Sequence, residues 1–205
     1  MNYLPIFQKG QSYTEYRNLL DQLLEEGKTT GEIHSEAYLR HAGLNIKRMN
    51  RLDKRPELSS EITSVFSNLN CPMLWLIITE GWCGDAAQIL PIVERLANQS
   101  PNVITRYILR DEHPEVMDQF LTDGAKAIPV VVFLDPESGS VLGHWGPRPI
   151  EGQEIMKAWK ASGSGDYEVV SEQMHTWYAK DKTVSIQKEF SQAVTKAAEL
   201  EAHQS

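Results

Sequence analysis

Cys83 is the residue whose type and position in this sequence most clearly indicate a chemical role. Its segment, EGWCGDA (residues 80–86), lies between an apolar run typical of a buried strand and a stretch with helical periodicity. A thiol at the first turn of a helix lies beside unpaired backbone N–H groups and the positive end of the helix dipole, and both stabilise a thiolate. The position therefore predicts a reactive thiol. The alternative is a helix-start residue without reactivity.

Two acids near Cys83 oppose a thiolate. Asp85 supplies a carboxylate to the first turn of the expected helix, which stabilises the helix but disfavours a negative sulfur next to it. Glu80 adds to that opposition. We therefore expect weaker thiolate activation than in a general reductase.

Cys71 is the other cysteine of the chain, and it precedes the strand that Cys83 follows. At about 3.3 Å per strand residue, the two thiols lie on the order of 25 Å apart. A disulfide needs Cα atoms within about 7 Å, so an internal bridge is not expected. Cys71 is predicted to be a small buried apolar residue, which leaves a protein with one functional thiol.

The middle of the chain predicts the frame that positions Cys83. Strands are expected at residues 72–79, 103–109, 129–135 and 141–145, the last two joined by a hairpin turn. Helices are expected at residues 84–98, 114–121 and 150–161. Parallel crossovers combined with an antiparallel hairpin predict an α/β fold, an α/β/α sandwich with a central mixed sheet.

Helical segments are predicted before this block. Capping-box spacings at Ser12–Glu15 and Thr29–Glu32 indicate one helix that ends at Gly27 and a second that reaches about Arg55. Pro56 suits the first turn of a third helix.

Two more helices are predicted after the Gly/Ser stretch at residues 162–165, at residues 167–180 and 183–201. We therefore expect an N-terminal helical extension over residues 1–69, a core domain over 70–162 and a C-terminal helical extension over 163–205. The extensions could cover a sheet edge, build a dimer or cover the cysteine, and the sequence does not distinguish these three roles.

An ordered set of features around Cys83 resembles the thioredoxin fold family over roughly residues 70–162. The set comprises a strand before Trp82-Cys83-Gly84, Pro91 inside the following helix, Ile128-Pro129 before the hairpin strands, and Gly146 at the hairpin's end. The helical ends resemble a bacterial branch described as thioredoxin family proteins, with WYAKDK (residues 177–182) as support. In that fold one cysteine attacks a disulfide, a second resolves the mixed disulfide, and a cis-proline loop pairs with the bound polypeptide.

The sequence departs from that pattern at three positions. The resolving position, three residues after Cys83, is Ala86, so the usual two-cysteine cycle cannot run. The buried aspartate that assists proton transfer in thioredoxins is replaced by Ile77, and the proline between the cysteines by Asp85. These departures predict a monothiol variant with WCGDA in place of the WCxxC motif.

The resemblance places several binding residues around Cys83. Ile128 and Pro129 would form the cis-proline loop, and Gly146 and Arg148 belong to the neighbouring hairpin exit. Arg148 either offsets the nearby acids or holds an anionic group such as a carboxylate, whereas the alternative is an arginine facing water. Trp82 is either a contact surface for the partner or a packing residue.

A basic cluster also lies at helical spacing in the N-terminal third: Lys47, Arg48, Arg51, Lys54 and Arg55. It could form a docking patch, but a solvated helix face is the favoured interpretation.

The composition excludes several classes of function. Twenty basic against 28 acidic residues give a formal charge of −8, which argues against a nucleic-acid partner. The apolar runs are too short to cross a membrane, and no secretory signal is recognised at the start, so a cytoplasmic protein is expected. The histidines show no metal-ligand spacing, and no phosphate loop is present, so no metal and no cofactor is predicted.

We therefore expect a thioredoxin-like thiol-disulfide exchange protein, whose partner is a protein disulfide or a low-molecular-weight thiol. The Cys83 thiolate would form a mixed disulfide, an external thiol would resolve it, and Trp82, Ile128 and Pro129 would position the substrate. The alternative is a redox-inactive peptide- or protein-binding, or chaperone-like, module on the same fold. A third interpretation is a sensing thiol that is oxidised to sulfenic acid.

Overall fold

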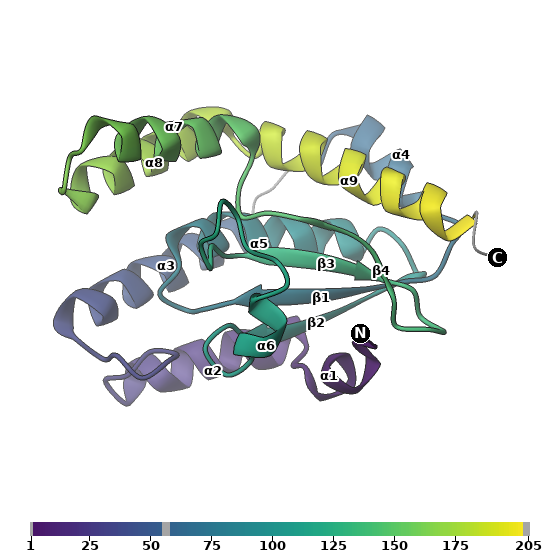
Figure 1. Cartoon of the computed structure of the whole chain (residues 1–205), viewed down its shortest axis with the longest axis horizontal. Coiled ribbons are helices and arrows are strands. Elements are labelled where there is room, and N and C mark those ends of the chain that lie inside the picture. The colour runs from purple at the N-terminus through teal and green to yellow at the C-terminus, as the bar shows by residue number, and fades with distance from the viewer. Residues whose placement is uncertain (1, 55–57, 203–205) are drawn as a thin grey trace.

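A four-stranded mixed sheet lies at the centre of the computed structural model, which describes residues 2–54 and 58–202 (Figure 1). The strand order is β2-β1-β3-β4, with bounds β1 Met73–Thr79, β2 Val103–Leu109, β3 Val130–Leu134 and β4 Val141–Trp145. β1 pairs parallel with β2 and antiparallel with β3, and β3 pairs antiparallel with β4. The structure has the expected α/β fold with a mixed sheet.

Helices cover both faces of the sheet. In the view of Figure 1, α5 (Gly84–Ala97) lies behind the strands and α6 (Pro114–Met117) lies in front of them. α3 (Glu36–Lys54) packs on the outside of α5, and α9 (Val184–Ala202) runs along β4. The other two C-terminal helices, α7 (Ile150–Ser162) and α8 (Tyr167–Asp181), pack against each other beyond the end of the sheet that leads into α5.

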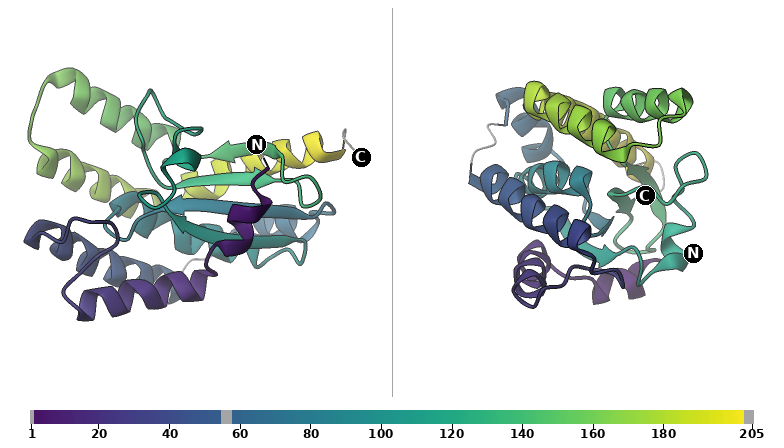
Figure 2. Two further views of the ribbon diagram at one scale, coloured as in Figure 1. Left: turned by 60° about the horizontal axis from the view of Figure 1, so that its bottom comes forward. Right: turned by 90° about the vertical axis from the view of Figure 1, so that its left-hand side faces the viewer.

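Two of the remaining N-terminal helices line the β2 edge of the sheet. α1 (Leu4–Lys9) and α2 (Tyr13–Glu25) lie beside β2 (Figure 2). α4 (Ser60–Ser67) packs against α9, so segments from the two ends of the chain meet. Among the described helices, none is long and apolar enough to span a bilayer.

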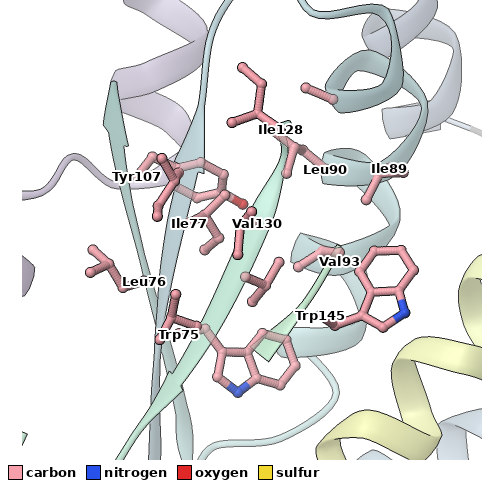
Figure 3. Packing of buried hydrophobic residues seen from close by; sticks show 14 of the residues in the cluster. Trp75, Leu76, Ile77, Ile89, Leu90, Val93, Tyr107, Ile128, Val130 and Trp145 are labelled. Atoms are coloured by element: carbon pink, nitrogen blue, oxygen red, sulfur yellow. The ribbon is translucent and has the colours of Figure 1, made fainter. Parts of the chain in front are cut away.

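The core forms where α5 and α9 meet the sheet. Figure 3 shows Leu90 and Val93 of α5 lying beside the central strands of the sheet. On the same face, Phe190 of α9 meets Trp75 edge-on with ring centroids 5.0 Å apart. β1 is almost entirely buried because sheet neighbours and helices enclose it, which explains its uninterrupted apolar sequence.

Most predicted elements agree with the structure, and the strands agree best. β2 and β4 have the predicted bounds, and β1 and β3 differ by one residue at one or both ends. The Ser12 capping box is present, because the Ser12 hydroxyl accepts the Glu15 N–H and the Glu15 carboxylate accepts the Ser12 N–H.

Several helix predictions are wrong. α1 was not predicted, and α6 ends at Met117 rather than at residue 121. The Thr29–Glu32 spacing does not start a helix, because α3 begins only at Glu36. Gly31 instead takes a positive φ of 76°, and Thr29 and Thr30 are buried. α4 starts later than predicted, capped by Ser59, and Pro56 and Arg55 lie outside the described residues.

Candidate functional site

Cys83 is the N-cap of α5, at the point where the chain leaves β1. The Ala86 N–H donates to Sγ over 3.4 Å, and the thiol donates to the Ile128 carbonyl oxygen over 3.3 Å. The side chain is only 7% exposed. The thiol therefore has both a donor and an acceptor within the protein.

The loop between β1 and Cys83 is held by residues from the N-terminal third. The Thr30 hydroxyl accepts the Gly81 N–H over 2.8 Å, and the Asn45 amide donates to the Gly81 carbonyl over 3.0 Å. Both partners are fully or almost fully buried. The chain before the thiol is thus fixed by α3 and by the segment that precedes it.

The pKa of Cys83 shifts in the opposite direction from a helix N-terminus acting alone. The pKa of the Cys83 thiol is raised to about 12, first by burial and second by the charge of Asp85. The Ala86 hydrogen bond and the charge of Arg148 lower it, but by less. Desolvation therefore outweighs the backbone hydrogen bonds at the start of α5, so the prediction of a stabilised thiolate is wrong, whereas the expected opposition of Asp85 to a thiolate is confirmed.

Asp85 is held by two partners from distant parts of the chain. Arg148 donates to Asp85 Oδ2 over 2.6 Å, and the Tyr178 hydroxyl donates to Asp85 Oδ1 over 2.7 Å. The side chains of Asp85 and Arg148 are each 14% exposed, so the interpretation that Arg148 faces water is wrong. Burial lowers the pKa of Arg148, but the charge and hydrogen bond of Asp85 more than offset this and raise it. The pair places a fixed carboxylate and a fixed guanidinium beside the thiol.

The two hairpin-side residues Pro129 and Gly146 are in contact with each other. The Ile128–Pro129 peptide bond is cis, and so is Gly146–Pro147. Gly146 has a φ of +138°, and a Cβ there would lie 2.3 Å from the Pro129 carbonyl oxygen. Only glycine fits this close approach, so Gly146 sets the distance between the β4 exit and the proline loop.

Trp82 and Glu80 have mainly structural contacts. The Trp82 ring packs 5.5 Å from the Tyr38 ring between centroids, and the Arg110 guanidinium lies 4.7 Å above it. Glu80 is fully buried, and its Oε1 accepts the Asp111 N–H over 2.9 Å. Burial raises the pKa of Glu80. Glu80 thereby joins the end of β1 to the loop after β2.

Cys71 differs from the prediction in one respect, because it is half-buried and not fully buried. Burial still raises its pKa. Both cysteines lie in the described part of the chain, and both are free thiols.

A cavity of about 430 Å³ opens beside Cys83. Of the predicted site residues, Trp82, Cys83, Asp85, Ile128 and Arg148 line it. Glu80, Pro129 and Gly146 are not among its lining residues and instead support the wall.

Two further walls of the cavity come from helices that sequence reasoning did not assign to the site. α3 contributes Tyr38, His41 and Arg48, and α8 contributes Val170, Met174 and His175, among others. The His175 ring lies over Gly84, where a Cβ would be 3.1 Å from Cε1. In the sequence, the basic cluster was the feature that could have assigned α3 to the site. For α8, the corresponding feature was its apolar residues at helical spacing.

The basic cluster itself divides in two. Lys47, Arg51 and Lys54 are exposed, in agreement with a solvated face. Arg48 is half-buried and faces the cavity, where its guanidinium donates to Asn45 Oδ1 over 2.8 Å.

Comparisons with known proteins agree with this architecture. A family model described as thioredoxin matches residues 32–160. A solved structure of a protein of unknown function from Pseudomonas aeruginosa is similar, with a TM-score of 0.63 at 17% identity, covering 96% of this chain and 99% of that one. An HIV epitope scaffold is also similar, with a TM-score of 0.61 at 17% identity, covering 95% and 98%. No curated protein matches the sequence significantly. Since the family model covers more than half of the sequence, this chain belongs to the thioredoxin family.

Proposed function

We propose that this chain is a thioredoxin-fold binding module, in which the cavity beside Cys83 holds a ligand while Cys83 remains a neutral thiol. The observation that carries the proposal is the environment of Sγ, which is buried, hydrogen-bonded to Ala86 and Ile128, and adjacent to the Asp85 carboxylate. With its pKa raised to about 12 by burial and by the charge of Asp85, the thiol is almost entirely protonated at pH 7. The thiolate fraction is too small for efficient attack on a disulfide.

The three predicted segments of the chain contribute differently to the cavity. We propose that residues 70–162 form the thioredoxin-like domain, and that the extensions 1–69 and 163–205 contribute α3 and α8 to the cavity walls. Among the three roles open to the extensions, covering the cysteine is the one that the contacts of Tyr178 and His175 favour. The two free thiols fit a reducing compartment, and we propose the cytoplasm.

A second candidate function is thiol-disulfide exchange through Cys83 alone, in a monothiol branch of the family with WCGDA in place of WCxxC. The observation in its favour is that Cys83 lies in the cavity wall, where its thiol contacts the carbonyl oxygen of Ile128, the residue before Pro129. In this scheme the Cys83 thiolate attacks one sulfur of a disulfide, a mixed disulfide forms, and the other sulfur leaves as a thiolate. An external thiolate then attacks the mixed disulfide and releases Cys83 as a thiolate, so two sulfur–sulfur bonds form and two break.

An exchange assay separates the two candidates. The protein is incubated with a mixed disulfide of glutathione and a peptide, with reduced glutathione as the resolving thiol. The binding module predicts that the intact chain and Cys83→Ser release the peptide equally fast, within about twofold of the uncatalysed reaction. Cys71→Ser is the matched control, because it removes the other thiol and leaves Cys83 in place. Turnover that persists in Cys71→Ser and disappears in Cys83→Ser would contradict the binding module and support exchange.

A further inference from the structure

The cavity beside Cys83 is rich in cations, although the chain as a whole carries a formal charge of −8. Four arginine and lysine side chains line it, against one carboxylate, that of Asp85. Three of the four cations already have a carboxylate partner; these ion pairs are Arg148–Asp85, Arg110–Asp111 and Lys126–Asp118. The fourth cation, Arg48, has no carboxylate within ion-pair distance in residues 2–54 and 58–202.

Arg48 is held in place by a neutral partner. Its guanidinium donates to Asn45 Oδ1, and the fully buried Asn45 donates in turn to the Gly81 carbonyl, two residues before Cys83. Burial and the neighbouring Arg51 both lower the pKa of Arg48, which shows that its charge is poorly compensated. A fixed, half-buried guanidinium without a counter-charge is unfavourable, and a bound anion would relieve that cost.

Two imidazoles line the same part of the cavity, His41 on α3 and His175 on α8. The pKa of His175 is lowered to about 4, first by burial and second by the charge of Arg48. The Gln88 amide lies 3.5 Å from His175 Nδ1, and since that amide nitrogen can only donate, the neutral ring carries its proton on Nε2. The wall near Arg48 therefore presents one cation and two imidazoles, and Asp85 is the one carboxylate among the described residues that line the cavity. Outside that lining, the charge of Glu168 acts on His41.

The rest of the cavity is apolar and of limited size. Its walls include Tyr38, Trp82, Met156, Val170 and Met174. A volume of about 430 Å³ lies within the range of small-molecule sites. Because α8 covers Gly84 and is bonded to Asp85 through Tyr178, a small molecule fits better than an extended polypeptide.

We propose that this cavity binds a small organic anion, whose carboxylate or phosphate group lies against Arg48 and whose apolar body contacts the aromatic and methionine side chains. The inference rests on the proposed function, because it requires that the cavity holds a ligand. The guanidinium would form charge-assisted hydrogen bonds with the anion, and Asn45 would keep the guanidinium directed at it.

The test uses three probes of similar size: benzoate, phenyl phosphate and the neutral benzamide. Binding is followed by NMR through the ring resonances of Trp82 and His175, two residues that line the cavity. We expect at least one anion to bind about tenfold more tightly than benzamide, because the anion adds a charge-assisted hydrogen bond to Arg48 and a tenfold ratio corresponds to about 1.4 kcal/mol. Preference for phenyl phosphate identifies a phosphate ester, and preference for benzoate identifies a carboxylate.

Arg48→Gln and Arg51→Gln form a matched pair, because both remove one positive charge from α3, but only Arg48 lines the cavity. Arg48→Gln is expected to weaken anion binding about tenfold or more, and Arg51→Gln to change it less than about twofold. Arg48→Lys, which keeps the charge but not the planar fork, should give an intermediate affinity and guards against misfolding of the glutamine variant.

Three results would overturn the inference: equal losses in Arg48→Gln and Arg51→Gln, benzamide binding as tightly as the anions, or no binding of any probe at about millimolar concentration. Benzamide binding in the cavity without anion preference would overturn the anion assignment and leave the binding module intact. The binding module itself fails on a separate result, which is Cys83-dependent turnover in the exchange assay.

Discussion

Asp85→Asn is expected to lower the pKa of Cys83 by about 1–3 units and to destabilise the fold by about 3 kcal/mol. The Asp85 carboxylate raises the pKa of the Cys83 thiol, whereas the charge of Arg148 lowers it. When the carboxylate is removed, the opposing charge of Arg148 remains beside the sulfur. Burial remains, so the pKa stays above that of an exposed cysteine. The fold loses stability because Arg148, 14% exposed, is left as a nearly buried charge without its counter-ion.

Two measurements on Asp85→Asn check this expectation: the free energy of unfolding in denaturant, and the rate of Cys83 alkylation as a function of pH. The matched control is Glu154→Gln, which breaks the exposed Lys157–Glu154 ion pair and should leave both quantities unchanged. The account of the Asp85–Arg148 pair is wrong if Asp85→Asn is as stable as the control, or if its Cys83 reacts no faster than in the unaltered chain.

Gly146→Ala is expected to destabilise the protein by about 3–5 kcal/mol or to prevent folding. Two costs combine at this position. An alanine at a φ of +138° is strained, and its Cβ would lie 2.3 Å from the Pro129 carbonyl oxygen, a backbone atom that cannot move aside cheaply. Denaturant unfolding of the purified variant measures the loss, and failure to obtain folded protein counts as the extreme of the same effect.

Gly163→Ala separates the two costs. Gly163 ends α7 with a φ of +68°, and no described atom lies within 4 Å of the position of its Cβ. Its replacement should therefore cost only the backbone strain, about 1–2 kcal/mol. If Gly146→Ala and Gly163→Ala destabilise the protein equally, the close approach between the β4 exit and the Pro129 loop does not contribute.

The central sheet could be predicted from the sequence because its signals are local. β1 is enclosed on both faces and reads as an uninterrupted apolar run, and β4 follows a hairpin turn of ordinary chemistry. The position of Cys83 at the start of α5 was predictable for the same reason. The identical capping-box spacing succeeded at Ser12 and failed at Thr29, because tertiary contacts bury Thr29 and Thr30 beside Gly81.

The chemistry of the site could not be predicted in this way, because it depends on contacts between distant residues. Tyr178 reaches Asp85 across 93 positions, and Arg148 reaches it across 63. The helix dipole is a local effect and could be anticipated, whereas the burial of Sγ arises only when α5, the Ile128 loop and the helices around the cavity assemble. Burial, which has the largest effect on the pKa of Cys83, could therefore not be predicted from the sequence.

A pH titration of Cys83 alkylation measures whether this residue remains a neutral thiol at physiological pH. The experiment uses Cys71→Ser, so that all modification occurs on Cys83, and compares the native protein with the same chain in denaturant. We expect the native thiol to titrate with a midpoint above about pH 9.5 and the denatured thiol with one near the ordinary value of about 8.5. A native midpoint at or below about 8.5 would show instead that the folded site stabilises the thiolate.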